Sequence, residues 1–260
     1  CYYVRVLDNN FDRALEIMAD IFLNSVFDEQ EMSKEKKVII EEINMYEDSP
    51  EELVFELLNK NIWDGSSISR PILGSIENVE SFTQEDIKKY YSENYLPENI
   101  IISLAGNFKT EVMLEKIKNY FGDLKNKSQA QKINQITYKK SIAFKKKDIE
   151  QVHICMGFPG VKISLEDNYS MALLNTIFGG GMSSRLYQKV REENGLAYSI
   201  FSCDYSYKTA GTFLIYAAIN PAKVQDCIDL IIKEVKDLKT DLITQEQLSK
   251  TKEQVKANYL

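Results

Sequence analysis

The stretch GGGMSSRLYQKVREENGLAY, residues 179–198, is the part of the chain that decides the fold. Its three glycines, Gly179 to Gly181, predict a turn that needs positive φ and opens a helix. Gly195 predicts the end of that helix before a strand rich in aromatic residues. Arg191 and Tyr198 lie on either side of the helix end, so a cation and a phenol can face one cleft. A phosphate-binding glycine loop is disfavoured, because no Lys-Ser/Thr pair and no G-x-G-x-x-G pattern occurs here.

On either side of this stretch, apolar periodicity, helix caps and prolines indicate where helices and strands begin and end. Thr83 is placed to cap one helix, and Pro50 to begin another. Helices are predicted over 11–27, 32–46, 51–62, 83–93, 110–121, 166–178, 221–239 and 244–260. Strands are predicted over 1–7, 100–105, 151–158, 197–207 and 212–219, and the last two are predicted to pair with each other.

The chain also contains an internal repeat. Residues 2–22 and 213–235 both read as strand, turn and amphipathic helix, and a second helix follows each copy. About seventy residues of strand, helix and glycine turn precede the second copy within the later half, and nothing comparable precedes the first. The sequence therefore predicts an internal fragment of a longer protein, with its first module truncated at the start.

The predicted fold class is mixed α/β (α+β), with two homologous domains that each pack a mainly antiparallel sheet against helices. The first domain spans 1–122 and the second 141–260, the latter truncated at its C-terminal end. The segment 123–140, rich in Lys, Asn, Gln and Ser, is predicted to be the linker between them.

Composition narrows the functional class. The 260 residues carry a net charge of −7, which argues against a nucleic-acid-binding protein. No apolar run reaches the length of a membrane span, and no signal peptide is visible. The four scattered cysteines, Cys1, Cys155, Cys203 and Cys227, favour reduced thiols and a cytoplasmic location. An unpaired strand at 1–7 predicts self-association of the isolated chain, as a homo-oligomer or by swapping.

His153 is the only histidine, so this chain cannot build a two-histidine metal site. A structural role, or a place in a substrate groove, is favoured for it over catalysis. Glu41 and Glu42 form an acidic pair that the repeat replaces by Ala257 and Asn258, so the fold itself does not require them.

Four segments occur in an order that resembles one family: EKKVIIEEI (35–43), RPILG (70–74), YLPEN (95–99) and the block 179–198. The chain resembles the pitrilysin, insulin-degrading enzyme and mitochondrial processing peptidase family of inverted zinc peptidases, whose metal-binding helix reads H-x-x-E-H. The resemblance spans nearly the whole chain. It implies tandem homologous α/β domains and a zinc-dependent metalloendopeptidase that hydrolyses peptide substrates.

The resemblance also implies site residues. Glu42 matches the third zinc ligand, with Glu35 as its supporting carboxylate on the same helix. Arg191 and Tyr198 match the pair that holds the substrate carbonyl and its oxyanion. From the residues alone, Glu42 also reads as a solvated helix acid, Arg191 as half of a surface ion pair, and Tyr198 as a packed strand residue.

The H-x-x-E-H segment itself is absent from this sequence. We therefore expect zinc in the full-length parent, but neither bound zinc nor activity in this chain alone. The alternative is a non-catalytic family member that acts as a structural or partner subunit. A nucleotide-binding α/β protein rests on the glycine triplet alone and is the weakest reading.

Overall fold

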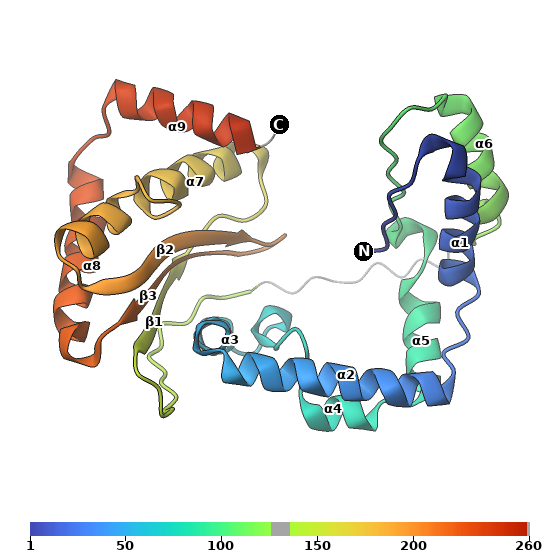
Figure 1. Ribbon diagram of the computed structural model, residues 1–260, viewed down its shortest axis with the longest axis horizontal. Coiled ribbons are helices and arrows are strands. Elements are labelled where there is room, and N and C mark those ends of the chain that lie inside the picture. The colour runs from blue at the N-terminus through green and yellow to red at the C-terminus, as the bar shows by residue number, and fades with distance from the viewer. Residues whose placement is uncertain (126–135, 259–260) are drawn as a thin grey trace. The chain divides into compact units, whose positions relative to one another are not determined.

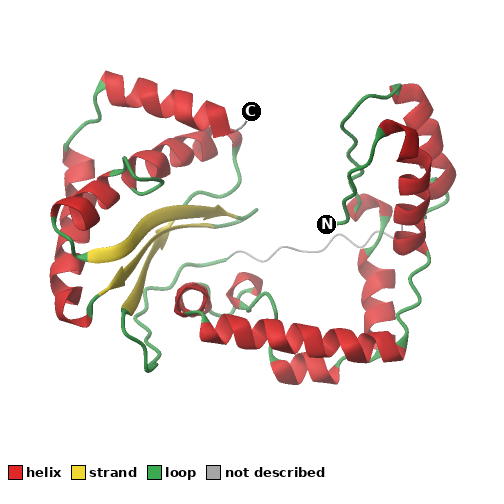
Figure 2. Cartoon of the chain, viewed as in Figure 1, coloured by secondary structure: helices red, strands yellow, loops and turns green. Residues whose placement is uncertain are grey.

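The computed structural model describes residues 1–125 and 136–258, which form two compact units (Figures 1 and 2). Residues 1–42 and 75–132 make up the first unit, and residues 43–74 and 133–260 the second. The domain bounds 1–122 and 141–260 stay a prediction; in the structure, residues 43–74 pack with the second unit. Most of the predicted linker, residues 126–135, lies outside the described residues.

The helices agree with those predicted from the sequence, except that the short helix at 76–81 was not predicted and the first helix ends at Leu23 instead of 27. Ser49 caps the helix that begins at Pro50, and Thr83 forms a capping box with Asp86, so both predicted helix starts are confirmed. The helices are α1 (Phe11–Leu23), α2 (Glu29–Asp48), α3 (Pro50–Ile62), α4 (Ile76–Ser81), α5 (Gln84–Asn94), α6 (Thr110–Phe121), α7 (Leu165–Phe178), α8 (Val224–Thr240) and α9 (Gln245–Asn258).

The second unit contains a three-stranded antiparallel sheet of β1 (Val152–Pro159), β2 (Ala197–Ser206) and β3 (Gly211–Ile219), in the order β1-β3-β2. The predicted pairing of the last two strands is confirmed. Gly157 lies opposite Leu214 on β3, and a bulge interrupts β2 between Ala197 and Ser199. Such a bulge re-aims neighbouring side chains, and here it lies at Tyr198.

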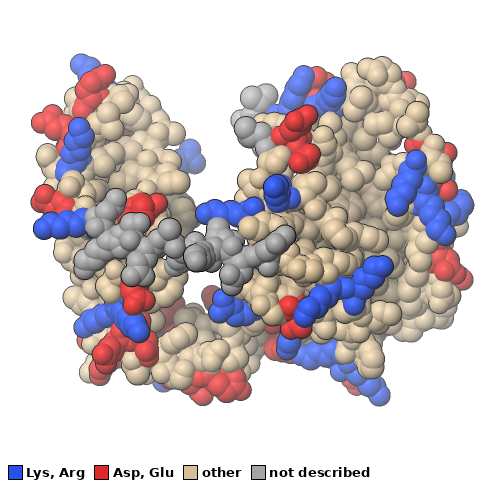
Figure 3. All heavy atoms as spheres, turned by 180° about the vertical axis from the view of Figure 1, so that it is seen from behind, with Lys and Arg blue, Asp and Glu red and all other residues tan. Residues whose placement is uncertain are grey.

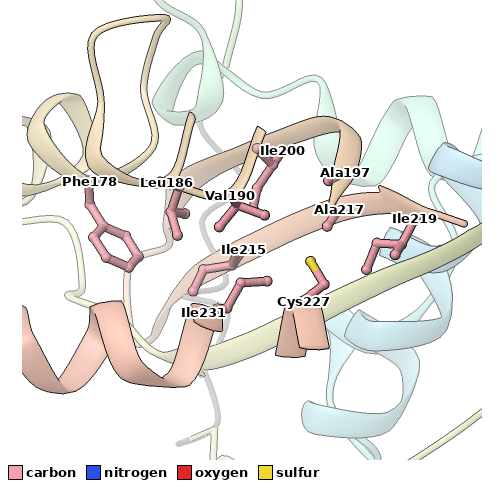
Figure 4. Packing of buried hydrophobic residues seen from close by; sticks show 10 residues of the cluster. All are labelled: Phe178, Leu186, Val190, Ala197, Ile200, Ile215, Ala217, Ile219, Cys227 and Ile231. Atoms are coloured by element: carbon pink, nitrogen blue, oxygen red, sulfur yellow. The ribbon is translucent and has the colours of Figure 1, made fainter. Parts of the chain in front are cut away.

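Both faces of the sheet are covered, so nearly every residue of the central strand β3 is buried. On one face, Cys227 and Ile231 of α8 point toward Ile215, Ala217 and Ile219 of β3 (Figure 4). The same cluster takes in Phe178, Leu186, Val190, Ala197 and Ile200. On the other face, alternate residues of the strands meet α3, and Phe55 packs against Phe201 and Tyr216.

The first unit is held together largely by aromatic packing. The Phe22 ring of α1 lies within 6.4 Å, centroid to centroid, of the rings of Tyr2, Tyr91, Tyr95 and Phe121. The Tyr91 hydroxyl also donates a hydrogen bond to the carbonyl of Phe22. This cluster joins α1, α5 and α6, which explains why these helices lie in one unit.

Two predicted strands, 1–7 and 100–105, are wrong as strands. The structure gives them no ladder of hydrogen bonds to any described segment, and most of their apolar side chains are exposed, Tyr3 at 87% and Ile101 at 91%. Their β-branched and aromatic composition favours extended backbone, but a strand also needs a neighbour to pair with.

The order of elements supports the predicted repeat at the level of local structure. In the first copy, a 3₁₀ turn at Asp8–Asn10 precedes α1 and α2. In the second copy, a 3₁₀ turn at Pro221–Lys223 follows β3 and precedes α8 and α9. The first copy differs because its opening segment, residues 1–7, forms no ladder with the described residues.

Candidate active site

Residues 179–198 contain a π-helical segment, η4 (Tyr187–Glu193), between the glycine turn and β2. Leu186 and Val190 are both 0% exposed and anchor it in the hydrophobic cluster. Arg185, just before η4, forms an ion pair with the buried Glu234 of α8, with its Nη2 3.3 Å from Oε2. Three residues within six positions therefore fix this segment on the second unit. Short π-helical segments occur often at functional sites.

A tight turn then brings Tyr198 back beside Arg191. Gly195 has a φ of 56°, a left-handed conformation that favours glycine. Its amide donates to the Arg191 carbonyl at 3.0 Å, and the Lys223 ammonium donates to the Gly195 carbonyl at 3.0 Å. As a result, the Arg191 guanidinium carbon lies 5.5 Å from the centre of the Tyr198 ring, within the range of a cation–π contact.

Both side chains are accessible to a ligand. Tyr198 is 73% exposed although it belongs to a strand, and Arg191 is partly exposed. The guanidinium also stacks on a second ring, that of Tyr187, at 4.9 Å. The in-plane N–H groups of an arginine and the hydroxyl of a tyrosine can donate hydrogen bonds to the same oxygen of a bound carbonyl group.

Close packing against β2 explains why residue 179 of the glycine turn is glycine. We expected positive φ at Gly179–Gly181, and this is wrong, because none of the three has it. A Cβ at Gly179 would lie 2.4 Å from the backbone nitrogen of Ser202, while one at Gly181 would meet nothing within 4 Å. The Ser202 amide donates to the Gly179 carbonyl at 3.2 Å, so the glycine allows the turn to touch β2.

Glu35 and Glu42 lie on α2 in the first unit, both exposed and seven residues apart, which places them two helical turns apart on the same face. Within the described ranges, no three His, Cys, Asp or Glu side chains come together in a way that could hold a metal ion. Glu42 supplies at most one of the three protein ligands of a catalytic zinc site. The described residues therefore do not fit a zinc ion by themselves.

His153 lies on β1, where its Nδ1 is 2.8 Å from the Tyr216 hydroxyl. Partial burial lowers the pKa of His153, which favours the neutral imidazole. Burial also raises the pKa of the Cys155 and Cys203 thiols, so neither is an activated nucleophile. These groups belong to the packing of the sheet against α3.

Charge alone does not single out a site. Lys and Arg side chains are interspersed with Asp and Glu over the face that Figure 3 shows. No described helix combines the length and apolarity needed to cross a bilayer. The sequence pointed to Arg191 and Tyr198 as candidate site residues but not to Tyr187, although Tyr187 lies four residues before Arg191 on a predicted helix, a spacing that brings side chains together.

Comparison with known proteins matches the chain to one family. Residues 1–76 match the family model described as Insulinase (Peptidase family M16), and residues 81–255 match the one described as Peptidase M16 inactive domain. An uncharacterized zinc protease of Bacillus subtilis, YmxG, is 38% identical over 260 residues, which is all of this chain and 63% of that protein. One from Rickettsia felis is 37% identical over 265 residues, again all of this chain and 63% of that protein.

Solved structures share the fold. A peptidase M16 inactive domain from Pseudomonas fluorescens superposes with a TM-score of 0.88 at 20% identity, over 95% of this chain and 61% of that one. A protease from Helicobacter pylori gives 0.85 at 24% identity, over 97% of this chain and 62% of that one. The chain spans 56–63% of the length of the similar curated relatives. Two family models together match nearly the whole chain, which thus belongs to the insulinase family, peptidase family M16.

Proposed function

We propose that this chain is part of a zinc-dependent metalloendopeptidase that hydrolyses peptide bonds, and that it is inactive alone. The observation that carries the proposal is the pairing of Arg191 with Tyr198, an accessible cation 5.5 Å from a 73% exposed phenol ring. Family membership and the relatives' description as zinc proteases support the same reaction class. The homology of two tandem domains, 1–122 and 141–260, is part of the proposal.

In this proposal the residues of the second unit bind and orient the substrate. The N–H donors of Arg191 hold the carbonyl oxygen of an extended peptide, and the Tyr198 hydroxyl donates to that oxygen as negative charge develops on it. Both groups are fixed by the core, by the Gly195 turn and by Lys223 before substrate arrives. Such preorganisation lowers the barrier, because the donors do not have to reorient during the reaction.

Glu42 is proposed as one zinc ligand of the longer polypeptide, with Glu35 as the carboxylate that supports it. Their exposed positions two turns apart on α2 support this assignment, because neither is tied into an ion pair with a described residue. The remaining ligands would come from residues outside this chain. A cytoplasmic location stays a prediction.

The test is peptide cleavage by the full-length polypeptide, followed with a quenched fluorescent substrate of unstructured sequence. We expect cleavage that a chelator abolishes and added zinc restores. Arg191→Gln and Tyr198→Phe should each lower kcat/KM by about ten- to a thousandfold, the range for losing a donor to a developing oxyanion. Tyr205→Phe, on the same strand, is the matched control and should cleave normally.

Two results would contradict the proposal. Cleavage that persists in chelator would show that the reaction does not depend on a metal. Normal rates in both Arg191→Gln and Tyr198→Phe would show that these two residues do not form the site. A full-length protein that binds zinc but cleaves no peptide would favour a non-catalytic structural or partner subunit instead.

A further inference from the structure

Tyr187 is the residue of this region that the proposed function has not used. It is the first residue of η4, four positions before Arg191, so the two side chains lie one turn apart. The Arg191 guanidinium carbon lies 4.9 Å from the Tyr187 ring centre, closer than the 5.5 Å to the Tyr198 ring. The cation therefore contacts two aromatic rings, one from the helix and one from the strand that follows it.

The residues that precede Tyr187 and Arg191 in sequence determine where these two side chains point. Leu186 and Val190, also four positions apart, are completely buried in the hydrophobic cluster. Because Tyr187 and Arg191 each follow one of these anchors, their side chains emerge next to the buried face of the helix. The Tyr187 ring is thus supported by a packed segment, which makes it a firmer base for the cation than a loop residue would be.

Competing charges nearby are weak or already engaged. Glu193 forms an ion pair with Lys189 at 2.7 Å, on the same segment. The carboxylate oxygen of Glu192 lies 3.8 Å from the Arg191 Nε, beyond hydrogen-bond distance. The Arg191 guanidinium is therefore in contact with the two rings and forms one long ion pair, at Nε, with Glu192. Ring contacts engage the face of an arginine and leave its in-plane N–H donors free.

We propose that Tyr187 is a positioning residue whose ring holds the Arg191 guanidinium against Tyr198 and keeps its N–H donors available for the oxygen of a bound peptide carbonyl. This inference rests on the proposed function. A carboxylate at position 187 would hold the cation as firmly but would consume the donors that the substrate needs. Phenylalanine should serve as well as tyrosine, because the contact uses the ring and not the hydroxyl.

The first arm of the test needs no activity and uses the 260-residue chain. Ring currents should shift the Arg191 side-chain NMR signals upfield, as measured with arginine labelled in its side chain and assigned with Arg191→Lys. Tyr187→Leu should move these signals back toward their free values, Tyr187→Phe should retain the shift, and Tyr205→Leu should leave it unchanged. Unshifted signals in the parent chain, or no response to Tyr187→Leu, would overturn the stack. Unchanged fluorescence of the single tryptophan, Trp63, would show that each variant is folded.

The second arm measures peptide cleavage by the full-length polypeptide. Tyr187→Leu should lower kcat about two- to fivefold with little change in KM, the size expected for one accessible cation–π contact, and Tyr187→Phe should restore it. A normal kcat in Tyr187→Leu, with Arg191→Gln impaired, would overturn the positioning role and leave the proposed function standing. A normal rate in Arg191→Gln itself would instead overturn the proposed function, and the positioning role with it.

Discussion

The ion pair between Arg185 and Glu234 should be a main support of the segment that carries Arg191. Glu234 is 2% exposed, and both Nε and Nη2 of Arg185 lie 3.3 Å from the same carboxylate oxygen. Replacing Arg185 by Leu leaves a buried carboxylate without its cation. Breaking a buried pair costs about 3–5 kcal/mol. Because the Arg185 side chain keeps 24% of its surface exposed and the contacts are long, we expect about 2–3 kcal/mol.

The assay can use a probe that the chain already contains. Trp63 is its only tryptophan, is buried in the second unit, and donates from Nε1 to the Thr212 hydroxyl at 3.0 Å. Its fluorescence during urea unfolding therefore reports on the unit that contains the ion pair. For a unit of this size, the loss corresponds to a fall in Tm of about 5–10 °C.

Two further variants complete the test. The double variant Arg185→Leu with Glu234→Leu should recover much of the loss, because no lone carboxylate is then buried. Lys233→Ala removes an exposed contact to Asp237 on the same helix and should change stability by less than about 0.5 kcal/mol. The reasoning is refuted if Arg185→Leu costs no more than Lys233→Ala, or if the double variant is less stable than both single ones.

Three other predictions concern the sheet of the second unit. Gly179→Ala should destabilise the chain by about 1–3 kcal/mol, because the added Cβ meets the backbone of β2. Gly181→Ala, with open space around it, should be neutral or slightly stabilising in the same urea assay. Equal effects of the two variants would contradict the packing argument. Thr212→Val should cost about 1–3 kcal/mol by leaving the indole N–H of Trp63 buried without an acceptor, and an unchanged melting curve would show that this hydrogen bond is unimportant. Burial lowers the pKa of His153 below 6.5 in the folded chain, so the unfolded chain binds the proton more tightly. The free energy of unfolding should therefore fall as the pH drops below 6.5. His153→Gln should flatten the plot of stability against pH in that range, and an unchanged plot would contradict the argument.

The sequence predicted the helices well because their signals are local. Thr83 with Asp86, and Ser49 with Pro50, carry their capping information within four residues, and both helix starts were found. The strands at 1–7 and 100–105 were not confirmed, because a strand depends on pairing with segments that local composition does not reveal. The pairing of β2 with β3 was predicted because those strands are adjacent in the chain.

The candidate site shows the same difference between features that depend on neighbouring residues and features that depend on distant ones. The accessible Arg191 and Tyr198 pair follows from a helix, a glycine turn and a strand that are contiguous in sequence. The reason for glycine at Gly179 was predicted wrongly, because its constraint is contact with Ser202, a residue on a later strand. The proposed metal-ligand role of Glu42 came from the family resemblance, because Glu41 and Glu42 are adjacent and both exposed on α2.

Zinc content of the full-length polypeptide tests the central claim most directly, because Glu41 and Glu42 are adjacent glutamates of which only one is proposed to bind metal. Metal analysis after exhaustive dialysis should find about one zinc per chain in the parent and in Glu41→Gln, and much less in Glu42→Gln. Equal zinc in both variants, or no zinc in the parent, would contradict the assignment of this chain to a zinc peptidase through Glu42.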